Sequence, residues 1–323
     1  MRKVKKPKKP VPIALFCSDI HLSDEVPSAR AETAEEWRTV QYNYLQQMIE
    51  IAVKNDVPIL IAGDIFHTPE VSLKLLNGVM LNFTNAPTIY AIAGNHDLPH
   101  HNYNNIYNSA YGSLVISDKI INIGIHETIE IHFRRKRLKA WGFPYGTDLI
   151  GIEKDPDICN IALAHKFCWF GKNGHKKADE QNRADQLAKQ LEGFDVAVFG
   201  DNHIGFLHER DIDVFNCGCM IPRRLPEQLL TPQVGLLYSD NRIKAIPLDN
   251  SRDKWKDKIE LPENPATSSL DVYSIFEGME NLPAESKVDF AERVFELIEQ
   301  NDIREEVKSI VLNTLNNVKR ELV

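Results

Sequence analysis

The sequence predicts an α/β fold in which buried strands alternate with amphipathic helices. Short apolar runs recur along the chain, and most are continuous rather than alternating in polarity, as expected for strands covered on both faces. Between them, apolar residues repeat every three or four positions, which is the period of a helix packed on a sheet. This alternation is typical of layered α/β proteins.

The individual elements follow from the same spacing. Apolar periodicity predicts helices over residues 37–52 and 73–83, the second presenting Leu73, Leu76, Met80 and Phe83 to the core. Residues 114–143 and 204–247 contain β-rich runs separated by Gly, Pro and Asp turns, which predicts a second, more antiparallel sheet. Continuous apolar runs predict buried strands at residues 13–17, 59–62, 88–93, 158–164 and 196–199.

Four segments are predicted. Residues 1–11 are basic, contain prolines and lack periodicity, so we expect a disordered tail. Residues 12–249 form the main domain. Residues 250–270 include a Pro-containing stretch that predicts a linker, and residues 271–323 carry the apolar spacing of a small C-terminal helical region.

Composition excludes several classes of protein. With 43% hydrophobic and 26% charged residues the chain is not wholly disordered, and it lacks the run of about 18 apolar residues that a membrane helix needs. Five scattered cysteines, an odd number, argue against a disulfide framework. We therefore expect a cytoplasmic protein with no membrane partner, in the host cytoplasm if it is viral.

The polar residues that follow the five predicted strands carry the functional signal. Ligands bind at this edge of α/β sheets, and burying so many lone pairs without a cation would be costly, so the pattern predicts a metal site. Five strand ends supply, in order, Asp19 and His21; Asp64; Asn95, His96 and Asp97; His165; and Asp201 and His203.

The donor types indicate which metals to expect. Carboxylate, amide and imidazole ligands suit manganese, iron or zinc, whereas a structural zinc site would be expected to use thiolates. The close pair Cys217 and Cys219 has no second pair, so we interpret it as core packing. The donors exceed what one ion needs, and with one bridging carboxylate they divide into two sites, as in two-metal displacement at phosphorus.

The order Asp-x-His, Gly-Asp, Gly-Asn-His-Asp, His, Gly-x-x-His over residues 12–247 resembles the calcineurin-like metallophosphoesterase superfamily. The resemblance implies a four-layer αββα sandwich. It implies that Asp19, His21 and His203 hold one metal, that Asp64 bridges, and that Asn95 and His165 hold the other. His96 would be the general acid and Asp97 the carboxylate that orients it.

Within the superfamily, two stretches look most similar to SbcD-type DNA exonucleases and their phage-encoded relatives: residues 94–99 and 216–224. By that analogy a coiled-coil ATPase subunit of the SbcC type is a possible partner, which the helices after Phe290 would bind. A homodimer is equally open.

One position departs from the family pattern. The last motif is usually Gly-His-x-His, and here Asp201 replaces the first histidine. A carboxylate can ligate the same cation, so we interpret Asp201 as a second-site ligand. The extra negative charge leads us to expect a preference for hard ions, manganese above all, and a greater need for cationic side chains to hold the substrate phosphate.

Charge gives mixed indications about a nucleic-acid partner. The formal net charge is −8, and six of the 38 basic residues lie within residues 1–10, which leaves −14 on the rest of the chain. Residues 134–139 are rich in Arg and Lys, which we interpret as a solvated face. Residues 165–177 interleave aromatic residues with lysines, which fits either a stacking platform beside a backbone groove or core packing of Phe167 and Trp169.

The leading hypothesis is a two-metal phosphodiesterase that hydrolyses DNA in recombination or repair, as an exonuclease or endonuclease. Two cations make hydroxide available near neutral pH and neutralise the phosphate oxygens. Lys166, Arg223 and Arg224 are the candidate phosphate-binding residues. The alternatives are a protein phosphatase, a hydrolase of small phosphodiesters, and a catalytically silent scaffold.

Overall fold

The computed structural model describes residues 9–133, 136–171, 174 and 178–256, which include four α-helices and twelve strands. The predicted C-terminal helical region lies outside these residues, as does most of the basic tail. The helices are α1 (Ala34–Asn55), α2 (Leu73–Thr84), α3 (Ala110–Ile116) and α4 (Ala184–Gln190). The strands are β1 (Pro12–Cys17), β2 (Ile59–Ala62), β3 (Ile89–Ile92), β4 (Ile121–Asn122), β5 (Thr128–Phe133), β6 (Lys136–Phe143), β7 (Ile158–His165), β8 (Val196–Gly200), β9 (Phe206–His208), β10 (Asp213–Asn216), β11 (Gln233–Tyr238) and β12 (Ile243–Pro247).

The strands form two six-stranded sheets, in the orders β12-β11-β1-β2-β3-β4 and β5-β6-β7-β8-β10-β9. In both sheets the central strands are parallel and the antiparallel pairs lie towards an edge. The expectation of a separate antiparallel second sheet is therefore wrong in part. Strands β11 and β12 pair with β1 in the first sheet, while the buried strands β7 and β8 form the middle of the second.

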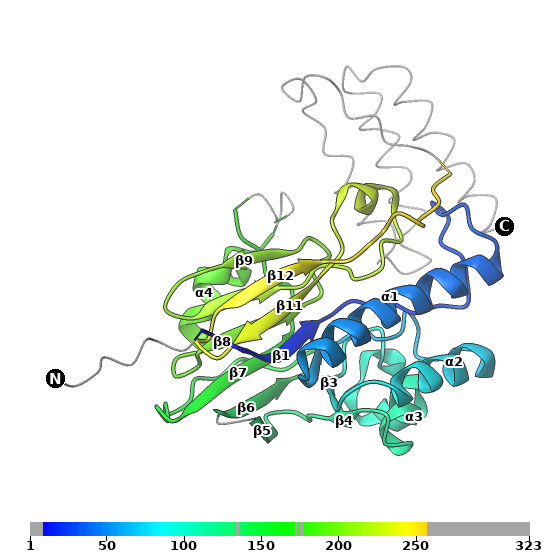
Figure 1. The fold of residues 1–323 in the computed structure, drawn as a ribbon. Coiled ribbons are helices and arrows are strands. Elements are labelled where there is room, and N and C mark those ends of the chain that lie inside the picture. Colours follow the sequence, from blue (N-terminus) through cyan, green and yellow to red (C-terminus); the bar gives the residue numbers. More distant parts are fainter. Residues whose placement is uncertain (1–8, 134–135, 172–173, 175–177, 257–323) are drawn as a thin grey trace, which may run out of the picture. The chain divides into compact units, whose positions relative to one another are not determined.

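Three apolar cores separate four layers, which confirms the αββα sandwich. One core joins β1–β3 to α1, α2 and α3, and another joins β7 and β8 to α4. The third lies between the sheets, where Phe16 and Leu60 face Leu163 and Val198. Figure 1 shows α1 running alongside β1, with α2 and α3 beyond it and α4 near β9. None of the described helices is long and apolar enough to cross a membrane.

Helix α1 follows the sequence pattern closely. It begins with a capping box in which Thr33 accepts from the Glu36 amide while the Glu36 carboxylate accepts from the Thr33 amide. Its buried face includes Trp37, Tyr44 and Met48, as predicted.

Helix α2 forms where it was predicted, and of the four predicted core residues Phe83 is buried while Leu76 and Met80 pack partly buried against the core. Leu75, Val79 and Phe83 are buried, whereas Leu73 is 75% exposed. The apolar residues of α2 surround much of the helix, so spacing alone did not identify every residue that packs on α1 and the sheet.

Strand register brings the predicted strand ends to one level. Cys17 lies opposite Ile61, and Ala62 opposite Ile92, in the first sheet. His165 lies opposite Gly200 in the second. Because the sheets are packed face to face, the loops that leave these ends lie at a common edge.

A buried ionic cluster ties residues 250–256, the start of the expected linker, to the beginning of α1. The guanidinium of Arg30 has no exposed surface and donates to Glu32 at 2.7 and 3.1 Å and to Asp253 at 2.8 Å. It also donates to the carbonyl of Pro222 at 3.0 Å, and it lies over the rings of Trp37 and Trp255. This part of the linker is therefore packed on the domain.

We predict that Arg30→Met lowers the free energy of unfolding by about 3–5 kcal/mol, because removal of one partner leaves buried carboxylates unpaired. Urea unfolding followed by circular dichroism measures the change. The matched control is Arg242→Met, whose pair with Asp240 is mostly exposed and should contribute less than about 1 kcal/mol. Equal losses in the two variants would contradict the assignment.

Candidate metal centre

The loops that follow β1, β2, β3, β7 and β8 bring the predicted donors together across the two sheets. His165 Nε2 lies 3.0 Å from Asn95 Oδ1 and 3.3 Å from Asp64 Oδ2. His21 Nε2 lies 3.1 Å from His203 Nε2, although these residues are 182 positions apart. Five of the seven predicted ligands therefore meet at one place, where a sixth, Asp19, also has its carboxylate.

The donors form two adjoining groups. Within each, one ligand atom per residue lies within 4.8 Å of every other; the first group is Asp19, His21 and His203, and the second is Asp19, Asp64 and His165. Asp19 belongs to both, and His21 Nε2 is 3.6 Å from Asp64 Oδ2. The two groups are thus continuous, as a pair of cations sharing carboxylates requires.

Asp201 is set apart from these groups, and its role as a ligand stays a prediction. Its backbone N–H donates to Asp19 Oδ1 at 3.0 Å. Its carboxyl is close enough to act on His165, whose pKa it helps to raise. Burial raises the pKa of Asp201 itself.

The charges of the centre call for a cation. Burial raises the pKa of Asp19 to about 6, even though His165 and His203 oppose it. Burial alone would lower the pKa of His165, but the charge and hydrogen bond of Asp64 raise it well above its usual value. Without a metal, a proton on His165 supplies the positive charge that the carboxylates need. A divalent ion fits the same position and the same donor set.

Backbone conformation is strained at four of the predicted ligands. Asp19, His21, Asp64 and Asp201 all have positive φ, between 49° and 83°, a region that costs a non-glycine residue about 1–2 kcal/mol. The amides of Ile20 and His21 donate to the Asp64 carbonyl, and the Met220 amide donates to the Asp19 carbonyl. Such a strained conformation persists only where surrounding contacts hold the residue in it, which is typical of functional sites.

Two glycines make room for the predicted ligands Asp64 and His165. A Cβ at Gly94 would lie 2.0 Å from Asp64 Oδ1, and one at Gly63, where φ is +91°, would lie 2.3 Å from His165 Nδ1. Any side chain here would displace a ligand. The Gly-Asp and Gly-Asn motifs therefore have a steric cause.

Glu227 orients His203 and was missed by the sequence analysis. Its buried carboxylate accepts from His203 Nδ1 at 2.7 Å and from the amides of Arg223 and Arg224. Burial would raise the pKa of Glu227, but His203 outweighs it and lowers that pKa to about 2. The bond leaves Nε2 of His203 facing the centre, which is the usual arrangement for a metal-binding histidine. No spacing in the sequence marks Glu227.

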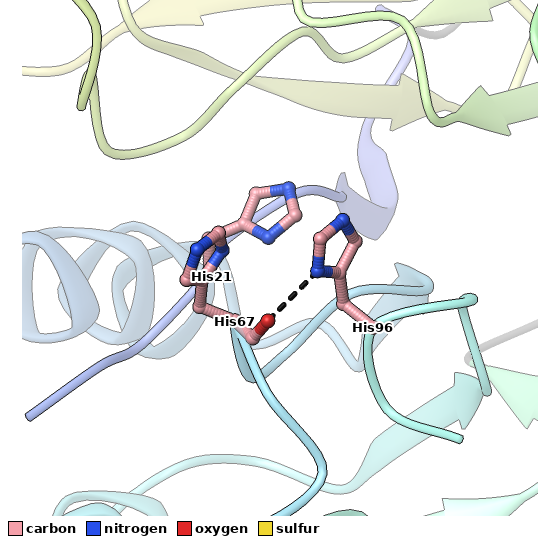
Figure 2. Close-up of side chains that lie close together, drawn as sticks. All are labelled: His21, His67 and His96. Carbon is pink, nitrogen blue, oxygen red and sulfur yellow. Dashed lines mark hydrogen bonds between the residues drawn. The ribbon is translucent and has the colours of Figure 1, made fainter. Parts of the chain in front are cut away.

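His96 has a different orienting partner from the one expected. Its Nδ1 donates to the carbonyl of His67 at 2.7 Å, and the two rings stack at 5.1 Å (Figure 2). Asp97 instead accepts from the amides of Ile65, Phe66 and Gly94. We therefore correct its predicted role: among the described residues it joins the loops after β2 and β3. His67, adjacent to a predicted motif, was also missed.

The predicted phosphate-binding residues differ in position. Arg223 is only 9% exposed and donates to the His21 carbonyl and to Ser23 Oγ, so it supports a ligand loop rather than standing as a surface clamp. Arg224 and Lys166 are half-buried. Arg224 is close enough to His67 to lower its pKa.

We predict that Mn²⁺ raises the melting temperature and that EDTA reverses the change. A ligand that binds only the folded state at 100 times its Kd contributes about 2.7 kcal/mol. Differential scanning calorimetry of Asp64→Asn should show most of this stabilisation lost, while Asp148→Asn, at an exposed aspartate, retains it. Full stabilisation of Asp64→Asn would contradict the role of Asp64 between the two groups.

Comparison with known proteins places the chain in a family. No curated protein matches its sequence. Among solved structures, a dimetal phosphatase from Danio rerio superposes with a TM-score of 0.46 at 12% identity, over 74% of this chain and 96% of the other. A Thermus thermophilus protein gives 0.43 at 13% identity, over 73% and 99%. Residues 14–205, more than half of the sequence, match the calcineurin-like phosphoesterase family, and the chain belongs to that family.

Proposed function

We propose that this metal-dependent phosphoesterase is a two-metal phosphodiesterase that hydrolyses DNA. The observation that carries the proposal is the pair of adjoining donor groups, which share Asp19 and are linked by Asp64. Two neighbouring cations are the arrangement used for in-line displacement at a phosphodiester. The resemblance of residues 94–99 and 216–224 to SbcD-type exonucleases supports DNA as the substrate.

The grouping of the donors, together with the sequence pattern for Asp201, supports the following ligand assignments. Asp19, His21 and His203 would hold one cation, and Asn95, His165 and Asp201 the other, with Asp64 between them. The cations, with manganese the expected metal, would supply an activated water and neutralise the phosphate oxygens. Glu227 fixes the tautomer of His203, because its carboxylate can only accept the proton on Nδ1.

His96 is the acid that we propose protonates the leaving oxygen. The His67 carbonyl can only accept, so Nδ1 of His96 carries a proton and its Nε2 remains for transfer. The ring is held on two sides, stacked on His67 and edge-on to His21. Its backbone amide donates to Asp64 Oδ1 at 2.9 Å. The backbone of the proposed acid is thus hydrogen-bonded to the proposed bridging ligand.

The substrate class can be tested with purified protein in Mn²⁺. Single- and double-stranded DNA, bis(para-nitrophenyl) phosphate and a phosphomonoester are supplied separately, with Asp64→Asn as the inactive control. We expect cleavage of DNA and of the diester. Preference for the monoester would support a phosphatase, cleavage of the diester alone would support a small-molecule enzyme, and cleavage of none would support a scaffold; each would contradict the proposal.

We predict that His96→Ala reduces DNA turnover by about 10²–10⁴-fold, the usual contribution of a general acid. Turnover of bis(para-nitrophenyl) phosphate should fall much less, because nitrophenolate leaves without a proton. Manganese content, measured by elemental analysis, should be unchanged.

His132→Ala is the matched control, since His132 lies exposed on β5 and should behave as wild type. The acid role of His96 would be refuted by equal losses on the two substrates, or by loss of manganese from the variant.

SbcC-type ATPase binding and homodimerisation remain proposals by analogy. The segment expected to bind the ATPase, after Phe290, lies outside the described residues.

A further inference from the structure

A cavity of about 480 Å³ opens among residues that the proposed chemistry does not use. Its walls come from three segments: the loop after β7, the start of α4, and the end of β9 with the turn that follows. The volume lies within the range of about 300–1,000 Å³ that is usual for ligand sites. The side chains that line the cavity include Trp169, Phe170, Arg183, Asp185, His208 and Arg210.

One wall is an accessible aromatic surface. Phe170 is 37% exposed, and its ring lies 4.1 Å from that of His208 and 6.4 Å from that of Phe206, measured between centroids. The inner face of Phe170 is therefore supported while much of the ring remains open. Rings held in this way serve as stacking platforms for nucleobases, each worth about 1–3 kcal/mol.

A polar atom in the same wall lacks a partner. His208 is only 6% exposed, and within the part of the chain that the structure describes its Nε2 is buried with no hydrogen bond. Burial lowers the pKa of His208, which favours the neutral ring. An unsatisfied buried nitrogen costs about 1–3 kcal/mol, which a hydrogen bond from the polar edge of a ligand would recover.

Of the two arginines at the cavity, Arg210 is the one left to contact a phosphate, because Arg183 pairs with Asp185 and Glu180. Arg183 is fixed by two hydrogen bonds to Asp185, at 2.6 and 2.8 Å. Arg210 is exposed, and no ion pair or side-chain hydrogen bond holds it among the described residues. An arginine at the rim of an aromatic cavity matches a base joined to a phosphate.

The cavity is built on the two segments that leave the metal centre. The loop carrying Trp169 and Phe170 begins at His165, and β9 begins three residues after His203. Asn202, between the predicted ligands Asp201 and His203, donates from Nδ2 to the Cys168 carbonyl at 2.8 Å. This hydrogen bond links the loop after β7 to the segment that leads into β9, next to the predicted ligands.

We propose that this cavity binds an unstacked nucleobase of a DNA strand whose backbone passes the metal centre. Phe170 provides the stacking face, His208 Nε2 a hydrogen bond to the base edge, and Arg210 a contact to the adjoining phosphate. The inference rests on the proposed function for the identity of the strand, but base binding itself requires no hydrolysis.

The test measures binding in EDTA, where the strand is not cut, by fluorescence anisotropy of a labelled single-stranded 12-mer. Phe170→Ala should weaken binding about 5- to 150-fold, the equivalent of one lost stacking contact. Phe170→Trp should retain it. Tyr107→Ala, at another exposed aromatic residue, should bind as wild type and should hydrolyse bis(para-nitrophenyl) phosphate in Mn²⁺ at an unchanged rate. The circular dichroism spectra of all variants should match that of wild type.

Two further binding experiments identify what occupies the cavity. A 12-mer of abasic residues should bind weakly and equally to wild type and Phe170→Ala. A nucleoside monophosphate that displaces the 12-mer at micromolar concentration would show that free nucleotides are the ligand, and would overturn the assignment to a strand.

Failure of this inference is distinguishable from failure of the proposed function. Absence of binding by wild type, or equal binding by wild type and Phe170→Ala, overturns the cavity assignment even if DNA is cleaved. Binding that depends on Phe170 in a protein that cleaves no phosphodiester supports the cavity and overturns the enzymatic proposal.

Discussion

The centre depends on negative charge that is buried where the two sheets meet. Asp19 and Asp64 are almost inaccessible to solvent, and two carboxylates in such a place are stable only beside positive charge. In the protein alone, the protons on His165 and His203 supply it. The surrounding structure holds these charged groups close together although their burial is unfavourable. Several predicted ligands have a left-handed backbone conformation, and glycines beside them leave room for their side chains.

The supporting contacts extend well beyond the ligands. Arg223 holds the loop of His21 through its carbonyl, and Glu227 fixes His203 while capping the amides of residues 223 and 224. Arg30 reaches the same segment through the Pro222 carbonyl and joins it to Asp253. A continuous set of buried hydrogen bonds therefore connects residues 250–256 to two ligand loops. Precise ligand positions in metal sites usually rest on such outer contacts.

Local sequence predicted the strands, α1 and the convergence of ligands, because each of these depends on nearby residues or on the rule that parallel strand ends share an edge. It did not predict that β11 and β12 pair with β1, since strand partners far apart in sequence leave no periodic signal. Glu227 and the His67 carbonyl were missed for the same reason. Asp97 shows the converse: its place beside His96 in sequence suggested a pairing, whereas its side chain turns to three amides.

The most direct test of this account is an anomalous-difference map from a crystal grown with Mn²⁺. We expect two peaks about 3.5–4 Å apart, the usual separation in two-metal sites. One should contact Asp19, His21 and His203, the other Asn95, His165 and Asp201, with Asp64 touching both. A single peak, or two peaks that Asp64 does not bridge, would contradict it.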